Sequence, residues 1–455
     1  MNPLTAVSPV DGRYREWCAP LTDYFSEWAY FRYRLKVEIE YLLALEAATA
    51  SPVEEGFAHY LRSLHERFTP SECEKIKRIE QTTRHDVKAL EYYLREAIAA
   101  FPDLNEDEKR RRSARVHFGL TSQDVNSTAL SLMLRDGLEK AWRPALTEVQ
   151  SMIEEMSRRW VKRPMMARTH GQPASPVTVG KEFKVFFDRL ERQAAVLDAL
   201  PHCAKFGGAT GNFNAHCVAF PHIRWDKFAD DFLMNVFGLH RLKTTTQIDP
   251  YDGFAEKFDA VKRINVVLID LCRDLWQYIS MDYFKLKIES HEVGSSTMPH
   301  KVNPIDFETA EGNLGLSNAI LTHLSEKLPV SRLQRDLTDS TVVRNVGVPL
   351  AHALVALRYI ASGLRKLELD DRVVEADLSA HAELLTEAVQ TLMRAFGDDR
   401  AYEKLKNLSR GEKRMSLDDL RRFVETLPLP DEARSRLLAL EPRDYVGLAP
   451  YVWDE

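Results

Sequence analysis

The feature that most constrains this chain is the helical spacing of its apolar residues over long stretches with few breaks. These stretches lie at about 128–160, 179–200, 264–279 and 350–367, and none of them alternates apolar and polar residues as a strand does. Only 19 of the 455 residues are glycine, so few positions favour tight turns. In the clearest stretch the apolar positions are Ile264, Val267, Leu268, Leu271, Leu275 and Ile279. The sequence therefore predicts an all-α fold built on long helices.

Chain length and two polar interruptions predict three domains. At 455 residues the chain exceeds what one hydrophobic core normally holds. The charged segment 101–114 and the segment 364–372 are the best boundaries, which gives domains 1–111, 112–365 and 366–455. Helices of the central block would pack as a bundle, and apolar stripes left over would bury against other copies of the chain. We therefore expect an oligomer.

The overall charge excludes some classes of partner. With 62 basic and 68 acidic residues the net charge is −6, which gives no general attraction for nucleic acid or an anionic membrane. The first thirty residues hold no apolar targeting segment, and no later run approaches a membrane span, so we expect a cytoplasmic protein. The scattered cysteines, without a C-x-x-C pair, predict neither a disulfide framework nor a zinc ribbon: Cys18, Cys73, Cys203, Cys217 and Cys272. Cys272, inside an apolar pattern, is expected to be buried.

Several common catalytic motifs are absent from the sequence. "GGATG" (207–211) lacks the spacing of a dinucleotide loop, and "GSSTMPHK" (294–301) lacks the second glycine of a phosphate loop. His291 has no histidine four residues later, and no G-x-S-x-G occurs, so zinc-protease and hydrolase sites are not expected.

Polar segments marked by glycine or proline interrupt the helical patterns instead. They lie at 8–14, 82–92, 117–127, 168–182, 244–252, 291–304 and 328–345. Together they carry cationic and hydroxyl groups suited to an anion, namely Arg13, Arg84, Lys301, Arg335, Arg344, Thr121, Ser122 and Ser340. Taken singly, each has a plainer explanation: a helix cap, a turn at "THGQP", or surface ion pairs of Arg335 and Arg344 with nearby aspartates. Taken jointly, they predict a site for a polyanionic small molecule.

The segment "GSSTMPHKVNP" (294–304) closely resembles the signature of the fumarase/aspartase superfamily, whose members eliminate fumarate from a succinyl group. "SPVDGRY", "RHDVKALEY", "HFGLTSQD", "RTHGQPASP" and "PVSRLQRDLTDSTVVRN" narrow the resemblance to the superfamily's bacterial enzymes for succinylated purine-pathway nucleotides. The resemblance spans essentially the whole chain. It implies a three-domain fold whose central helical bundle forms a twenty-helix core in a homotetramer, with each active site shared by three subunits. It also implies no metal and no organic cofactor.

The resemblance implies roles for individual residues. Ser295 would be the general base, ionised beside Lys301 in a glycine-containing loop that closes as a lid, and His170 would be the general acid. His85 is the rival acid, and in the family it orients the ligand. Contacts to the nucleotide phosphate would come from Arg13, Tyr14, Arg335, Ser340 and Arg344; Arg84 and Asp86 flank His85; Thr121, Ser122, Gln247, Lys301 and Asn303 would hold the succinyl end.

Two alternatives stay open at this stage. One is a sister lyase acting on malate, aspartate or argininosuccinate, which carry no phosphate, so the arginines of 331–345 argue against it. The other is a non-catalytic helical oligomer, against which the presence of both His170 and Ser295 argues.

Overall fold

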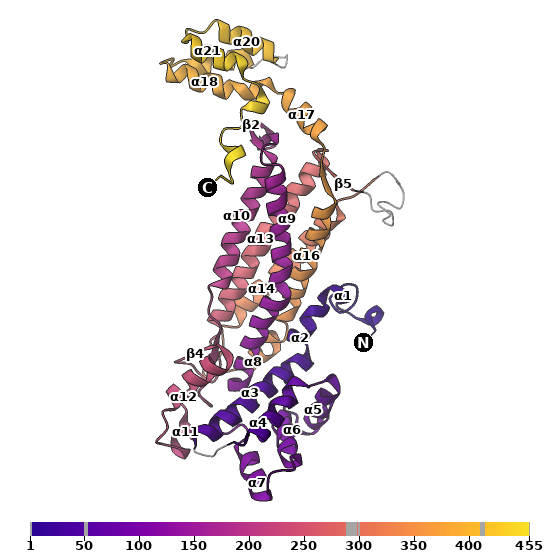
Figure 1. The fold of residues 1–455 in the computed structure, drawn as a ribbon, viewed down its shortest axis with the longest axis vertical. Helices are drawn as coiled ribbons and strands as arrows, with labels where there is room; N and C mark the ends of the chain where they lie inside the picture. The colour runs from indigo at the N-terminus through magenta and orange to yellow at the C-terminus, as the bar shows by residue number, and fades with distance from the viewer. Residues whose placement is uncertain (1, 50–52, 288–297, 299–300, 410–414, 455) are drawn as a thin grey trace. The chain divides into compact units, whose positions relative to one another are not determined.

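The structure, a computed structural model, describes residues 2–49, 53–287, 298, 301–409 and 415–454 (Figure 1). Contacts between residues divide the chain into two compact units. Unit 1 comprises Met1–Leu146, Gln193–Val266 and Gly312–Arg358, and unit 2 comprises Thr147–Arg192, Val267–Glu311 and Tyr359–Glu455. Each unit is therefore assembled from stretches that are distant in the sequence.

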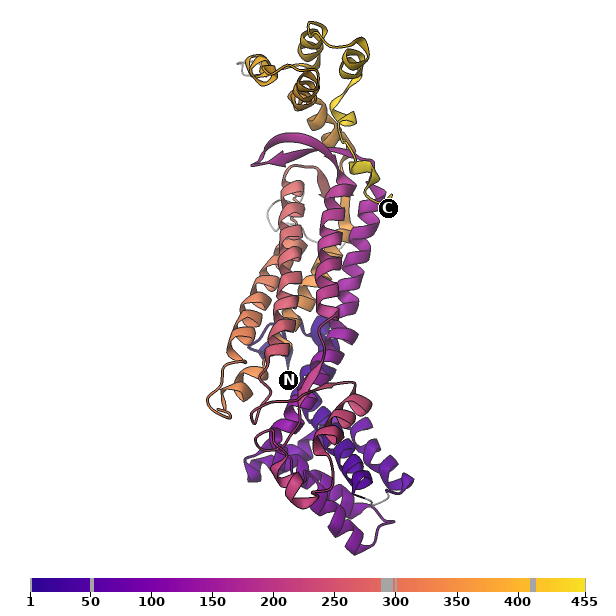
Figure 2. The same cartoon turned by 90° about the vertical axis from the view of Figure 1, so that its left-hand side faces the viewer.

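Long helices form where the apolar spacing predicts them (Figures 1 and 2). The pattern at 264–279 lies inside α13 (Asp252–Ser280), and the pattern at 179–200 becomes α10 (Val179–Asp198). The pattern near 128–160 begins in α8 (Ser122–Gly137), passes through the π-helical turn η3 (Leu138–Trp142) and continues as α9 (Arg143–Arg159). Further long helices are α14 (Ile305–Lys327) and α16 (Gly347–Lys366). The all-α prediction is confirmed, and Cys272 is buried in α13 as expected.

Unit 1 contains two apolar clusters. One fills the space among the N-terminal helices α3 (Glu27–Ala48), α4 (Glu55–Glu66), α5 (Pro70–Thr83) and α6 (Asp86–Ala100). It reaches from Phe31 to Val116 and includes Leu104 and Val116, which flank α7 (Glu106–Arg115). The other joins α3 and α8 to α12 (Trp225–Phe232) through aromatic side chains such as Tyr41, Trp225 and Phe232. Because α3 contributes to both clusters, it is buried on most of its faces.

Smaller elements complete unit 1. The short helices are α1 (Arg15–Cys18), α2 (Thr22–Phe25), α11 (Asn214–Ala219) and α15 (Thr338–Val343). Strands β3 (Cys203–Lys205) and β4 (His240–Leu242) pair in parallel, and the π-helical turn η4 (Leu233–Phe237) precedes β4.

In unit 2, side-chain contacts join segments of α9, α10, α13, α14 and α16 in a closed ring. Arg189 of α10 pairs with Asp270 of α13 at 2.5 Å, and Arg365 of α16 pairs with Glu148 of α9 at 3.0 Å. The other links are Gln150–Glu191 between α9 and α10, Arg273–Glu311 between α13 and α14, and Ser362–Asp306 between α16 and α14. The three ion pairs are exposed and add little stability singly, whereas the other two links are part-buried hydrogen bonds. Together the five links fix which helices are neighbours.

Unit 2 also contains two antiparallel pairs of short strands and the C-terminal helices. Strand β1 (Pro164–Thr169) pairs antiparallel with β2 (Gln172–Thr178), and β5 (Phe284–Leu286) pairs antiparallel with β6 (Leu367–Leu369). The C-terminal helices are α17 (Asp371–Ser379), α18 (Thr386–Ala395), α19 (Ala401–Ser409), α20 (Leu417–Glu425) and α21 (Asp431–Ala439). Buried side chains from Leu385 to Leu437 form an apolar cluster of their own there.

One helical stretch, Thr338–Lys366, is long and apolar enough to cross a membrane by length and composition. Its most apolar window, however, is 72% buried inside the protein. Leu350, Leu354 and Val355 in this stretch are fully buried. The stretch is therefore a core helix.

Candidate active site

Unit 1 contains an open cavity of about 480 Å³ lined by polar and charged side chains from five separate parts of the sequence. The parts are α3, the junction of α5 and α6, the start of α8, the residues around Tyr251 and the segment 335–344. Seven residues singled out in the sequence line it: Arg84, His85, Asp86, Ser122, Arg335, Ser340 and Arg344. The structure thus brings residues from four of the predicted polar segments to one cavity within a single chain.

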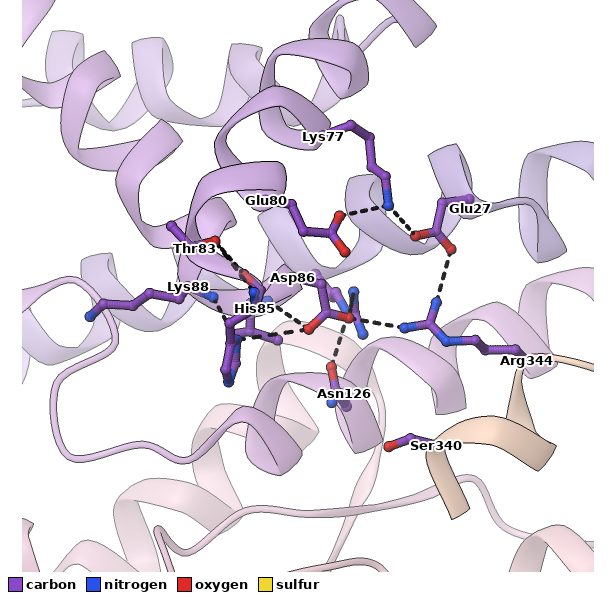
Figure 3. Close-up of polar contacts among 12 residues, drawn as sticks. Glu27, Lys77, Glu80, Thr83, His85, Asp86, Lys88, Asn126, Ser340 and Arg344 are labelled. Carbon is purple, nitrogen blue, oxygen red and sulfur yellow. Dashed lines mark hydrogen bonds and ion pairs between the residues drawn. The ribbon is translucent and has the colours of Figure 1, made fainter. Parts of the chain in front are cut away.

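The break between α5 and α6 positions three of these side chains, of which Figure 3 shows His85 and Asp86. Arg84 ends α5 in the left-handed region, with φ of 54°, which is a strained conformation for a residue with a side chain. His85 then begins α6 as its N-cap, and its Nδ1 accepts the backbone N–H of Lys88 at 3.1 Å. Because Nδ1 acts as the acceptor, the neutral imidazole carries its proton on Nε2. His85 is therefore held in one tautomer by the helix that it caps.

Asp86 is the electrostatic centre of the cavity wall. One of its carboxylate oxygens lies 3.0 Å from the buried Arg34 guanidinium and 3.0 Å from that of Arg344. Burial alone would raise the pKa of Asp86, but Arg34, the Val87 N–H and Arg344 outweigh it and lower the pKa to about 2. Arg344 also pairs with Glu27 at 2.9 Å, so two carboxylates hold this guanidinium (Figure 3).

The segment 335–344 forms the facing wall. Arg335 donates to the Ser340 hydroxyl at 2.6 Å and lies 3.5 Å from the buried Asp339 carboxylate. The Tyr251 hydroxyl donates to the same carboxylate at 3.3 Å, and burial raises the pKa of Tyr251 well above its ordinary value. The expected pairing of Arg335 with a neighbouring aspartate is present, whereas Arg344 pairs with Glu27 and Asp86 instead.

A buried ion pair supports the loop that carries Thr121 and Ser122. The backbone N–H of Thr121 donates to Asp124 at 2.8 Å, and the fully buried Lys205 ammonium lies 2.6 Å from the same carboxylate. Gly207 and Gly208, of the "GGATG" segment, also donate to Asp124 through their N–H groups. Burial lowers the pKa of Lys205, and the Asp124 carboxylate opposes this effect. The "GGATG" segment (207–211), which lacks the spacing of a dinucleotide loop, thus stabilises the start of α8 through Asp124.

Other predicted residues of unit 1 lie outside the lining of this cavity. Arg13 is exposed and Tyr14 is half-buried near Trp17, with ring centroids 6.4 Å apart. They precede α1, beside a second hollow of about 230 Å³ whose wall includes Asp11, Arg15 and Arg344. Thr121 is the N-cap of α8, and Gln247 is half-buried in the segment before α13.

Of the residues predicted to carry the chemistry, His170 and Lys301 belong to unit 2, whereas His85 lines the cavity of unit 1. His170 lies at the turn of the β1–β2 hairpin, where its imidazole is exposed. Lys301 is exposed and Asn303 is half-buried just before α14. Ser295 and the lid predicted around it lie outside the described residues.

Arg34 and Asn126 were missed by the sequence analysis, although both line the cavity. Arg34 is buried in α3 and donates to the Asn126 side chain of α8 at 2.8 Å. Arg34 interrupts no helix, so no break marks it, whereas Asn126 lies within the polar segment 117–127 but was not singled out there. The role of Asp124 at the start of α8 could have been predicted from the sequence, because an acidic residue three positions after Thr121 is typical of a capping box.

Comparisons with known proteins identify the family and the fold. The profile of the lyase family matches residues 12–318, and that of the adenylosuccinate lyase C-terminal region matches residues 331–446. The fold resembles that of a fumarate lyase from Mesorhizobium sp. BNC1, with a TM-score of 0.74, 20% identity and 95% of each chain covered. It also resembles a 3-carboxy-cis,cis-muconate lactonizing enzyme from Pseudomonas putida, with a TM-score of 0.72, 22% identity and coverage of 95% of this chain and 94% of that one. These findings define the chain as a lyase with the fumarase/aspartase fold.

More similar relatives narrow the assignment. The adenylosuccinate lyase of Dictyostelium discoideum is 47% identical, with 99% of this chain and 98% of that protein covered. The adenylosuccinate lyase of Escherichia coli strain K12 is 44% identical, with 100% of this chain and 99% of that protein covered. The chain belongs to the adenylosuccinate lyase family.

Proposed function

We propose that this protein is a carbon–nitrogen lyase that eliminates fumarate from adenylosuccinate, giving AMP, and from SAICAR, giving AICAR, in purine biosynthesis. The observation that carries the proposal is its full-length similarity to adenylosuccinate lyases at 44–47% identity. The cavity of unit 1 is consistent with such a substrate, because Arg84, Arg335 and Arg344 offer fixed positive charge to a phosphate or carboxylate. No cofactor is proposed.

The proposed reaction is an anti β-elimination. Ser295, as an alkoxide, removes a proton from the succinyl carbon next to a carboxylate. The electron pair first delocalises into that carboxylate, and Lys301 and Asn303 would stabilise the resulting negative charge. The C–N bond then breaks, and His170 protonates the departing nitrogen. These roles come from the matching motifs in this sequence.

We assign His85 an orienting role and give the acid role to His170. Because Nδ1 of His85 accepts the Lys88 N–H, its Nε2–H is the group available to a ligand in the cavity. A neutral Nε2–H suits hydrogen bonding to a substrate oxygen or nitrogen. Arg13, Tyr14, Arg335, Ser340 and Arg344 are proposed phosphate contacts, and Thr121, Ser122 and Gln247 are proposed contacts to the succinyl end.

The proposed assembly is a cytoplasmic homotetramer with a twenty-helix core and active sites built from three subunits. Within each chain we propose domains 1–111, 112–365 and 366–455. The separate apolar clusters at Phe31–Val116 and Leu385–Leu437 support independent cores at the two ends of the chain.

The direct test measures fumarate release from adenylosuccinate by ultraviolet absorbance with the purified protein. Fumarate release from argininosuccinate but not from adenylosuccinate would overturn the substrate assignment. Absence of release from any of the succinyl substrates would leave a non-catalytic oligomer as the better description.

Mixing inactive His170→Ala and Ser295→Ala proteins tests the shared sites. If the two residues act from different subunits, mixed oligomers contain some complete sites and regain part of the activity. No recovery despite proven subunit exchange would show that each site draws both residues from one chain.

A further inference from the structure

The hairpin that carries His170 has a tight turn. His170 and Gly171 join β1 to β2 and both have positive φ, 54° and 74°, as a two-residue hairpin turn requires. Among the residues described by the structure, none donates a hydrogen bond to the His170 imidazole or pairs with it. Its position therefore depends on how the two strands are held.

Strand β1 is fastened to α17 along one face. Met166 packs with Leu378 and Leu384 in a small buried cluster. Arg168, two residues further on and hence on the same face of the strand, donates to the Asp377 carboxylate at 2.9 Å. At the base of the strand, Arg163 pairs with Asp371 at 2.8 Å.

Asp377 is itself held by other groups. The oxygen that accepts from Arg168 also accepts from the Tyr283 hydroxyl at 2.5 Å. The other oxygen lies 3.6 Å from Nε2 of the buried His381. Because the carboxylate is fixed from several sides, it can fix the Arg168 guanidinium and with it the end of β1, two residues before His170.

Strand β2 has a second anchor. The pairing register shifts between Met165 and Ala167, which leaves a β-bulge on β2 around Ser175. The Ser175 hydroxyl donates to the Glu387 carboxylate of α18, which also accepts from the Tyr445 hydroxyl at 3.1 Å. Each strand of the hairpin is thus tied to a different C-terminal helix.

We infer that Arg168, Asp377 and Glu387 are positioning residues, through which the C-terminal helices hold His170 at the place where it delivers its proton. The inference rests on the proposed function, since it assumes that His170 is the general acid. It also gives the C-terminal helices a part in the chemistry although they do not carry the acid or the base. The Arg168–Asp377 pair is partly exposed, with side-chain exposures of 30% and 26%, so its effect on stability is small and its effect on geometry is the larger one.

The test compares Asp377→Asn, which keeps the shape of the side chain and removes its charge, with the intact enzyme. A displacement of the acid by about 1 Å lowers catalysis by as much as ~10²-fold, so we expect kcat to fall by roughly 10- to 100-fold while KM changes less than about threefold. Glu387→Gln should give a smaller fall of the same kind. Asp398→Asn is the matched control, because Asp398 pairs with Lys404 at 2.6 Å in the same C-terminal region without touching the hairpin.

Two further measurements separate positioning from general damage. The charge-swapped protein, with Arg168→Asp and Asp377→Arg together, should have a higher kcat than Asp377→Asn, because the swap restores an ion pair between the strand and α17. Single-turnover rates with excess enzyme should show that Asp377→Asn has little further effect once His170→Gln is present, because the acid that it positions is gone.

Wild-type kcat in Asp377→Asn, a rise of KM alone, or full additivity with His170→Gln would each overturn the inference. Failure of the proposed function looks different. In that case the intact protein releases no fumarate, or His170→Gln has no effect, before any positioning variant is compared.

Discussion

The cavity of unit 1 and the hairpin of unit 2 hold their functional side chains in opposite ways. In the cavity, Arg344 and Asp86 already contact each other, and Arg34 and Glu27 complete the network. On the hairpin, His170 is exposed at a two-residue turn. The difference separates two tasks. Under the proposed function, the side chains that would bind a multiply charged ligand are pre-organised by carboxylates, whereas the group that would transfer a proton is presented at the turn of a hairpin.

The largest expected effect is that of His170→Gln. Under the proposed function His170 is the general acid, so its loss should lower kcat by ~10²–10⁴-fold with little change in KM, because the proposal assigns chemistry to the hairpin and binding to the cavity. Steady-state fumarate release measures both constants. His59→Gln, on an exposed face of α4, is the control and should behave as the intact protein. A large rise of KM in His170→Gln would break the proposed separation.

Arg335→Gln should show the converse pattern. Losing a charge-assisted hydrogen bond to substrate costs about 1.5–3 kcal/mol, so KM should rise by roughly 10- to 100-fold with kcat nearly unchanged. The matched control is Arg332→Gln, because Arg332 lies in the same segment, pairs with Asp336 at 2.8 Å and does not line the cavity. Equal effects of the two variants would contradict a specific contact by Arg335.

The charge network of the cavity should appear as pH-dependent stability. The pKa of Asp86 falls from an ordinary 3.8 to about 2 on folding, so its stabilising contribution is fully present above about pH 5. It is lost as pH falls through the folded-state pKa, and it amounts to about 2 kcal/mol. Urea unfolding of the intact protein and of Asp86→Asn should therefore differ by about this amount at neutral pH. A difference that stays constant between about pH 6 and about pH 3 would rule out this role.

The smallest expected effect concerns the turn of the hairpin. Gly171 has φ of 74°, so Gly171→Ala should lower the unfolding free energy by roughly 1 kcal/mol. Gly56→Ala should change stability in the opposite direction, since Gly56 lies in α4 with open space around it. Urea denaturation of both variants tests the pair. An unchanged unfolding free energy in Gly171→Ala would show that the turn does not need the positive φ of Gly171, and that the hairpin constrains its residues less than the cavity does.

The long helices could be predicted from the sequence because their apolar spacing reflects burial in the folded chain. Residues of the cavity could be predicted where they break a helix, as Arg84, His85 and Asp86 do between α5 and α6. Arg34 could not, since a polar residue inside a helical pattern ordinarily faces solvent.

The β1–β2 hairpin also escaped the sequence analysis. Its second strand contains Pro173 and Pro176, which ordinarily argue against a strand, and the bulge near Ser175 breaks the alternation of side chains. The partner helices that fasten this hairpin lie some 200 positions away, with Arg168 and Asp377 separated by 209 residues. Local patterns carry no information about such pairs.

All five junctions between the two compact units fall within helices, in α9, α10, α13, α14 and α16. Each unit consists of three separate stretches of sequence, so neither can be produced by cutting the gene once. Every cut at a junction would also sever a helix. Chimaeras made by exchanging a compact unit between relatives would need five crossovers, each preserving helical phase. Variation in this protein is consequently easier to accept in loops and side chains than by recombination of whole modules.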